Sequence, residues 1–181
     1  TEVRSLFGRN RTLPIGQSFG VITVLGRRDI SPVEVATFRE DVSYSDGRRP
    51  DAIQFSHARQ DAFRRDFTIN GLFFDPLNDK VVDFVEGQRD LTNKVLRAIG
   101  DAEKRFDEDK LRMLRAIRFA ADFQFEIEPR TMAAIRCHAT KIKQVSVERI
   151  SGELAKMLVH PRRQTALRLL RDSQLYSCLL Y

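Results

Sequence analysis

The first third of the chain alternates apolar and polar positions in short runs, a pattern that predicts β-strands. The run FGVITVL (19–25) is rich in β-branched side chains, and VEVATF (33–38) repeats the pattern after a Ser-Pro turn signal. The run KVVDFV (80–85) predicts another short strand, and residues 59–70 predict a helix or helical turn. The charged stretch REDVSYSDGRRPD (39–51) contains Asp-Gly and Pro, which predicts a loop.

A helical period replaces this alternation after Gly87. In the segment 105–123, one helical face carries Leu111, Leu114, Ile117 and Ala121. Further amphipathic helices are expected in the segments 128–142, 146–159 and 164–176. The sequence therefore predicts an α+β chain, with a mixed-sheet part at residues 1–100 and an all-helical part at residues 101–181.

Composition narrows the class of protein. The chain has 181 residues, 42% of them hydrophobic, and a formal net charge of +6. This charge favours a polyanionic partner such as nucleic acid; the alternative is the mild basicity that many soluble proteins share. Cys137 and Cys178 lie far apart in no metal-binding spacing, which indicates free thiols in a reducing cytoplasm. No stretch approaches the roughly 18 apolar residues of a membrane helix. We therefore expect a cytoplasmic protein with no membrane partner, whose oligomeric state the sequence leaves open.

The segment RRDFTIN (64–70) carries groups suited to a nucleotide. Arg64 and Arg65 offer planar donor forks that match phosphate oxygens, and Asp66 can orient one of them. If the segment is helical, Asn70 lies on the same side as Asp66. These groups could hold a triphosphate and a ribose hydroxyl; the alternative is a solvated Arg–Asp cluster that contributes little stability.

The segment EDKLR (108–112) carries a second set of candidate residues. Glu108 and Asp109 precede Arg112 by four and three residues, so the side chains can meet on one helix face. A carboxylate only accepts hydrogen bonds and a guanidinium only donates them. Such a pair matches the amino group and ring nitrogen of cytosine or adenine, whereas uracil and guanine present a carbonyl beside an N–H. The alternative is an intrahelical salt bridge.

Three other side chains are candidates for contact with ligands. Arg115 and Arg118 follow Arg112 at intervals of three residues, opposite the apolar face, and form either a solvated face or a surface for RNA or nucleotide. Glu34 lies in the middle of an expected strand, with its neighbours on the other face. It is either a metal ligand or the polar side of an edge strand.

These motifs resemble those of the bacterial-type tRNA nucleotidyltransferases (CCA-adding enzymes) and of their close relatives, the bacterial poly(A) polymerases. The similar segments are RRDFTIN (64–70), VEVATFR (33–39), the stretch 105–129 and VERISGELAKML (147–158). Together they run in the family's order over nearly the whole chain. The resemblance implies a partial nucleotidyltransferase (polymerase-β-like) head with a mixed sheet, followed by an all-helical neck that binds RNA and nucleotide.

The resemblance also implies roles for individual residues. The residues expected to contact the phosphates and sugar of the incoming nucleotide are Arg64, Arg65, Asp66 and Asn70. Asp109 and Arg112 are expected to read its Watson–Crick edge, with Glu108 orienting the pair.

One feature of the family is missing from this sequence. The family's Gly-Gly turn and the Asp-x-Asp pair that holds two magnesium ions are not found, since the DED at 107–109 belongs to the neck signature. We therefore expect a fragment without this N-terminal segment and without the C-terminal body and tail. Such a fragment has no catalytic carboxylates of its own and is expected to be inactive alone, although Mg²⁺ serves the complete enzyme.

Two stretches of the sequence distinguish between the CCA-adding enzymes and the poly(A) polymerases. The segments RTLPIGQSFGVITVL (11–25) and SYSDGRRPDAIQF (43–55) are more similar to the CCA-adding branch. The predicted function is therefore addition of C and A, from CTP and ATP, to the 3′ ends of tRNA. The alternatives are a portion of a poly(A) polymerase that adds A to RNA 3′ ends, and an RNA- or nucleotide-binding module without catalysis.

Overall fold

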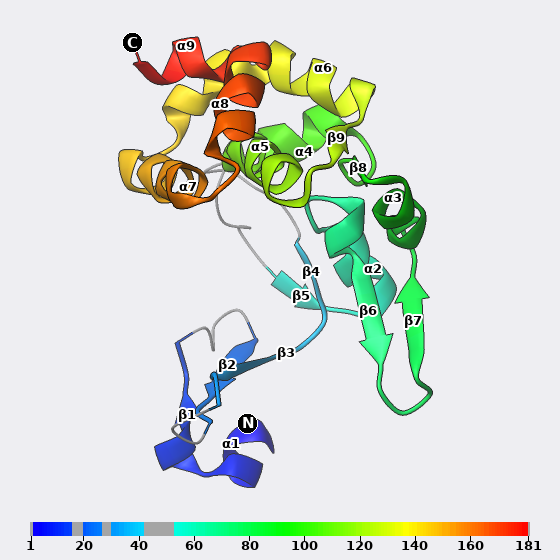
Figure 1. Cartoon of the computed structure of the whole chain (residues 1–181). Helices are drawn as coiled ribbons and strands as arrows, with labels where there is room; N and C mark the ends of the chain where they lie inside the picture. The colour runs from blue at the N-terminus through cyan, green and yellow to red at the C-terminus, as the bar shows by residue number, and fades with distance from the viewer. Residues whose placement is uncertain (1, 16–19, 27–29, 42–52, 181) are drawn as a thin grey trace.

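The computed structural model describes residues 2–15, 20–26, 30–41 and 53–180, and its N-terminal part is a small antiparallel sheet (Figure 1). The elements of this part are α1 (Glu2–Phe7), η1 (Arg9–Arg11), β1 (Thr12–Leu13), β2 (Val21–Val24) and β3 (Val33–Ala36). The strand order is β1-β2-β3, and Glu34 lies opposite Thr23 in the register. Both strands predicted within residues 19–38 are confirmed.

A second pair of strands corrects one prediction. Residues 39–51 were expected to form a loop, yet β4 (Arg39–Asp41) pairs with β5 (Ile53–Phe55). The backbone of Arg39 explains the strand, because its N–H donates to Asp61 Oδ1 at 3.2 Å and its carbonyl accepts from Arg64 Nε at 3.1 Å. The rest of the predicted loop lies outside the described residues.

The middle of the chain connects the sheet to the helices. Its elements are α2 (Ala58–Phe63), η3 (Thr68–Asn70), β6 (Leu72–Asp75), β7 (Lys80–Asp83), α3 (Gly87–Asn93) and β8 (Val95–Leu96). Strands β6 and β7 form a hairpin, which confirms the strand predicted at residues 80–85. Strand β8 pairs in parallel with β9 (Glu126–Ile127) of the helical part.

Helices make up nearly all of the C-terminal part. They are α4 (Ala102–Glu108), α5 (Leu111–Phe123), α6 (Pro129–His138), η4 (Ala139–Gln144), α7 (Val147–Val159), α8 (Arg163–Asp172) and α9 (Leu175–Leu180). The helix predicted over 105–123 is thus two helices. Asp109 has an extended backbone, and its carboxylate accepts the Leu111 N–H at 3.1 Å, so it ends α4 and begins α5. No helix in the described ranges is long and apolar enough to cross a membrane.

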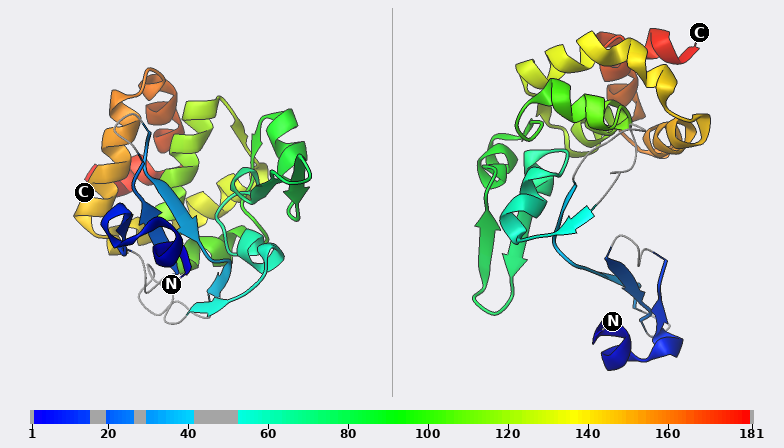
Figure 2. Two further views of the ribbon diagram at one scale, coloured as in Figure 1. Left: turned by 90° about the horizontal axis from the view of Figure 1, so that it is seen from below. Right: turned by 180° about the vertical axis from the view of Figure 1, so that it is seen from behind.

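The hydrophobic core surrounds α5, which lies among the other helices (Figure 1). The four residues predicted to share one face of this helix are all buried: Leu111, Leu114, Ile117 and Ala121. Phe67 and Leu96 join the core from the segments before α4, so they fix the middle of the chain against the helices. The sheet β1–β3 lies apart from the helices in Figure 1 and in the right-hand view of Figure 2. The core therefore anchors the two segments that carry the candidate motifs, RRDFTIN and EDKLR.

Candidate nucleotide-binding cavity

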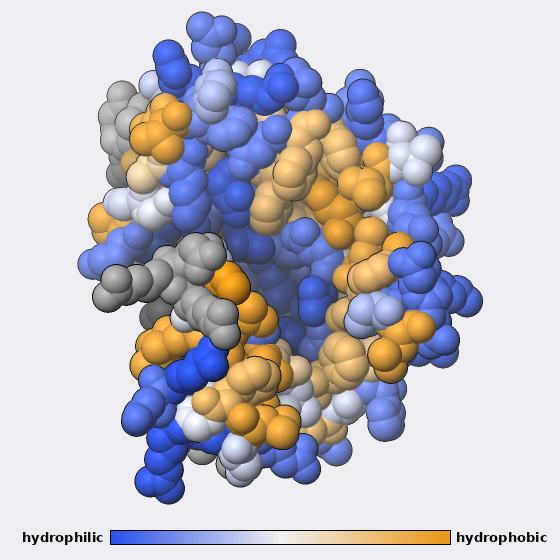
Figure 3. All heavy atoms as spheres, turned by 60° about the horizontal axis from the view of Figure 1, so that its bottom comes forward, coloured by the Kyte–Doolittle hydropathy of each residue, from blue (hydrophilic) through white to orange (hydrophobic). Residues whose placement is uncertain are grey.

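A cavity of about 510 Å³ brings together most of the candidate residues. It is lined by Arg64, Arg65, Asp66, Asn70, Asp109, Leu111, Arg112, Arg115, Phe119 and Arg149. The lining comes from three parts of the chain: the segment after α2, the start of α5, and α7. In the surface view of Figure 3, hydrophilic residues line a deep hollow and hydrophobic residues gather around it. Of the residues expected to bind the nucleotide or RNA, only Glu108 and Arg118 lie outside the cavity lining.

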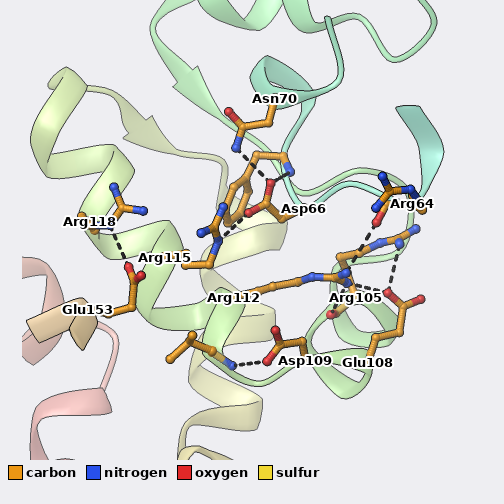
Figure 4. A network of polar contacts seen from close by, with 12 residues as sticks. Arg64, Asp66, Asn70, Arg105, Glu108, Asp109, Arg112, Arg115, Arg118 and Glu153 are labelled. Atoms are coloured by element: carbon orange, nitrogen blue, oxygen red, sulfur yellow. Dashed lines mark hydrogen bonds and ion pairs between the residues drawn. The ribbon is translucent and has the colours of Figure 1, made fainter. Parts of the chain in front are cut away.

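Asp66 is buried at the centre of the residues expected to contact the phosphates and sugar. Its Oδ1 accepts from Asn70 Nδ2 at 2.9 Å and from the Phe67 N–H at 3.0 Å, and its Oδ2 accepts from Arg115 Nε at 2.8 Å (Figure 4). The expected proximity of Asp66 and Asn70 is confirmed, although α2 ends at Phe63 and the segment is not one continuous helix. Asp66 therefore ties the start of the RRDFTIN segment to α5.

A carboxylate that the sequence analysis did not single out holds both arginines of this segment. Asp61 is 2% exposed, and its two oxygens bind Arg64 Nη2 at 2.8 Å and Arg65 Nη2 at 2.9 Å. Burial raises the pKa of the Asp61 carboxyl, but the hydrogen bonds from Arg64, from the Arg39 N–H and from Arg65 outweigh this and lower it below its ordinary value. The expected orienting role of Asp66 toward these arginines thus belongs to Asp61. The solvated-cluster alternative is wrong, because the carboxylates are buried.

Glu108 and Arg112 form the ion pair that their spacing predicted. Arg112 is 8% exposed, and its guanidinium also donates to the carbonyl of Arg105 at 3.0 Å and to that of Arg64 at 3.5 Å. The side chain is therefore oriented by both the helical part and the RRDFTIN segment, which explains how a long side chain keeps a fixed direction at the cavity.

Asp109 does not share that ion pair. Its carboxylate binds Arg149 Nη2 at 2.7 Å, across from α5 on helix α7. The expectation that Glu108, Asp109 and Arg112 meet on one helix face is therefore corrected: Asp109 lies in the break between α4 and α5. Asp109 and Arg112 nevertheless border the same cavity.

The arginine stripe of α5 is not a solvated face. Arg115 binds Asp66 and lies over the ring of Phe119, with 5.1 Å between its guanidinium carbon and the ring centroid. Arg118 Nε binds Glu153 of α7 at 2.7 Å. Burial raises the pKa of the Glu153 carboxyl, but its bonds to Arg118 and Lys156 lower it below its ordinary value. Arg115 thus belongs to the cavity, whereas Arg118 joins α5 to α7.

The described residues do not form a metal site of their own. Glu34 is exposed on β3, and the described ranges contain no group of three or more His, Cys, Asp or Glu side chains that could hold an ion. A divalent ion needs several oxygen ligands at once. The described residues therefore do not by themselves fit a bound metal.

Three contributing residues were missed at the sequence level. Asp61 had a signal, since it precedes Arg64 and Arg65 by three and four residues, the spacing of neighbours on a helix. Arg149 lies within the VERISGELAKML segment, but nothing in its spacing links it to Asp109, forty residues away. Arg105 precedes Glu108 by three residues and binds its carboxylate at 3.0 Å.

Two family models match the chain. Residues 1–97 match "Poly A polymerase head domain", and residues 124–180 match "Probable RNA and SrmB- binding site of polymerase A". The chain belongs to the Poly A polymerase head domain family. This confirms the resemblance on which the expected fold rested, a partial nucleotidyltransferase head followed by helices.

Curated relatives and solved structures agree with this family. The CCA-adding enzyme of Lactobacillus helveticus is 42% identical over 175 residues, and that of Enterococcus faecalis 40% over 176 residues. The matches cover 96% and 97% of this chain but only 43% and 42% of those enzymes, so the chain spans less than half their length.

The structure is similar to solved structures of the same kind. The Bacillus stearothermophilus CCA-adding enzyme in complex with CTP matches with a TM-score of 0.83 and 33% identity, over 96% of this chain and 40% of that one. A tRNA-processing enzyme with CTP matches with a TM-score of 0.77 and 27% identity, over 97% of this chain and 44% of that one.

Proposed function

We propose that this chain is the nucleotide-selecting part of an enzyme that adds C and A, from CTP and ATP, to the 3′ ends of tRNA. The observation that carries the proposal is the cavity lined both by the four residues expected to contact the phosphates and sugar and by Asp109 and Arg112. The CCA-adding relatives, which match nearly the whole chain, support it.

The phosphates and sugar of the nucleotide lie, in this proposal, against Arg64, Arg65, Asp66 and Asn70. Two guanidiniums held by the buried Asp61 keep a fixed direction, so their donors need little reordering when phosphate oxygens arrive. Arg115, held by Asp66, adds positive charge to the same wall and is a candidate contact for the nucleotide or the RNA end.

The base lies between Asp109 and Arg112. Asp109 accepts the exocyclic amino hydrogen of cytosine or adenine, and Arg112 donates to the adjacent ring nitrogen. Uracil and guanine place a carbonyl toward the carboxylate and an N–H toward the guanidinium, which leaves buried polar groups unpaired. A site built in this way rejects the wrong base strongly. Base choice then needs no nucleic-acid template.

Further parts of the proposal concern the complete enzyme. We place it in the cytoplasm, with the division between head and neck near residue 100. Its ion is Mg²⁺. The described residues contain no cluster that could hold this ion, so we expect other residues to supply most of its ligands, with Glu34 as a candidate among the described ones.

The test is transfer by a completed enzyme. Joining an upstream segment that carries the Asp-x-Asp pair should give Mg²⁺-dependent addition of C and A to tRNA ends. A correctly folded, completed protein that adds nothing to tRNA contradicts the proposal.

A poly(A) polymerase is the second candidate, because the matched head model carries that description. Addition of A alone, to RNAs without a tRNA fold, would support the poly(A) polymerase over the CCA-adding enzyme. The same cavity serves both candidates, so the assay must offer CTP and ATP separately and together.

A further inference from the structure

We propose that Arg105 is a positioning residue for base selection, which acts on Arg112 through Glu108. The inference rests on the proposed function of the cavity, because it concerns how the base-reading side chain is held. Arg105 was not among the residues expected to act in this site, and it does not line the nucleotide-binding cavity.

Arg105 joins three segments of the chain. Its Nη2 donates to the carbonyl of Phe63 at the end of α2 at 2.8 Å, and its Nε donates to the carbonyl of Ile99 at 3.3 Å. Its Nη1 donates to Glu108 Oε2 at 3.0 Å. The side chain is 16% exposed. A planar guanidinium can satisfy three such acceptors in fixed directions, whereas a lysine ammonium is a point charge on a flexible stem.

Glu108 is the link between the two arginines. The same oxygen, Oε2, accepts from Arg105 Nη1 and from Arg112 Nη1 (Figure 4). Glu108 is the last residue of α4 and its side chain is 28% exposed, so packing alone does not fix its direction. The bond to Arg105 supplies that direction, and Arg112 then follows the carboxylate.

The two arginines border different cavities. Arg112 borders the nucleotide-binding cavity, whereas Arg105 and Glu108 border a neighbouring cavity of about 400 Å³, together with Arg64. Arg105 therefore acts without touching the nucleotide. Its loss should leave the phosphate-side residues in place and change the direction in which Arg112 presents its donors.

The expected signature is a loss of selectivity that exceeds the loss of affinity. In the Arg105→Gln variant, the ratio of CTP to UTP affinity should fall roughly tenfold, which corresponds to one charge-assisted hydrogen bond. Affinity for CTP itself should fall less, because the phosphate contacts remain. Arg105→Lys should recover part of the ratio, since the ammonium can still bind Glu108.

The experiment is calorimetric titration of this chain and its variants with CTP, ATP, UTP and GTP. Glu108→Gln is the second variant: it weakens the same link from the other end while Arg105 keeps its bonds to Phe63 and Ile99. Arg89→Ala is the matched control, because Arg89 binds Glu86 at the same spacing of three residues in an exposed position. Arg89→Ala should leave the affinities and ratios unchanged.

The outcomes separate this proposal from the proposed function. If the parent chain does not prefer CTP and ATP, the proposed function fails, and this proposal fails with it. Suppose that the parent chain is selective and that Arg105→Gln folds. If this variant keeps the ratio of CTP to UTP affinity, or binds all four nucleotides more weakly by the same factor, Arg105 is only structural and this proposal alone is overturned. If Arg105→Gln does not fold, a retained ratio in Glu108→Gln overturns it.

Discussion

The helical region of this molecule contains the main hydrophobic core, whereas the strand-rich region leaves several apolar side chains exposed beside the buried Ile22 and Val24. In the helical region, Leu114 and Ile117 are fully buried in a core that α5 shares with its neighbours. In the sheet region, Val33, Val35 and Phe55 are 55%, 37% and 61% exposed. The helical region therefore has its own source of stability, whereas the sheet region exposes surface of the kind that marks contact with other protein or ligand.

The cavity lies where the segments from before and after residue 100 meet. The proposed phosphate side comes from the segment after α2, and the proposed base side comes from Asp109, α5 and α7. An ion pair and a hydrogen bond cross this boundary: Arg115 binds Asp66, and Arg105 donates to the carbonyl of Phe63. The proposed base wall is therefore built on the region that holds the core, and the proposed phosphate wall is attached to it by hydrogen bonds from charged side chains.

The largest expected effect is on the core. Leu114→Ala should lower the free energy of unfolding by about 2–5 kcal/mol, because it removes a fully buried side chain. Val35→Ala in the sheet, where the side chain is partly exposed, should cost less than about 1 kcal/mol. Chemical denaturation measures both. Equal costs would break the contrast between the two regions.

The next effect concerns the phosphate wall. Asp61→Asn removes the charge that holds Arg64 and Arg65, so affinity for all four nucleoside triphosphates should fall by roughly 10- to 100-fold, with their ratios unchanged. Asp75→Asn in the exposed hairpin turn is the control and should change nothing. Calorimetry measures the affinities. A change in base preference in the Asp61→Asn variant would mean that the residues proposed to bind the phosphates also influence the choice of base.

The base wall should show the opposite behaviour. Arg112→Ala should relax or abolish the choice of base while the protein stays folded, because the core around α5 does not depend on this guanidinium. Selectivity measured with the four nucleotides, next to a thermal melt of the same sample, checks this. Unchanged selectivity in a folded variant would remove Arg112 from the proposed site.

A smaller effect concerns acid stability of the helical region. The lowered pKa of Glu153 means that its bond to Arg118 stabilises the fold above the ordinary glutamate pKa of about 4.3. This contribution should be lost as the pH falls from that value through the lowered folded-state pKa. Glu153→Gln should flatten this part of the pH dependence of the free energy of unfolding. Chemical denaturation at several pH values measures that dependence. An identical slope in both proteins would contradict the assignment.

The sequence predicted what depends on local spacing. The buried face of α5, the Glu108–Arg112 pair and the proximity of Asp66 to Asn70 all follow from neighbours three or four residues apart. The break between α4 and α5 was missed because a helical period runs through it, whereas Asp109 ends one helix and begins the next. The pairs Asp109–Arg149 and Arg118–Glu153 join residues forty and thirty-five positions apart, so no local pattern contains them.

The most direct test of the central claim is calorimetric titration of this chain with CTP, ATP, UTP and GTP, each in the presence of magnesium. The account predicts binding of CTP and ATP and much weaker binding of UTP and GTP, since Asp109 and Arg112 border the cavity within this chain. Equal affinity for all four nucleotides would contradict the proposed base choice, and no binding of any would contradict the claim that these residues form a nucleotide site.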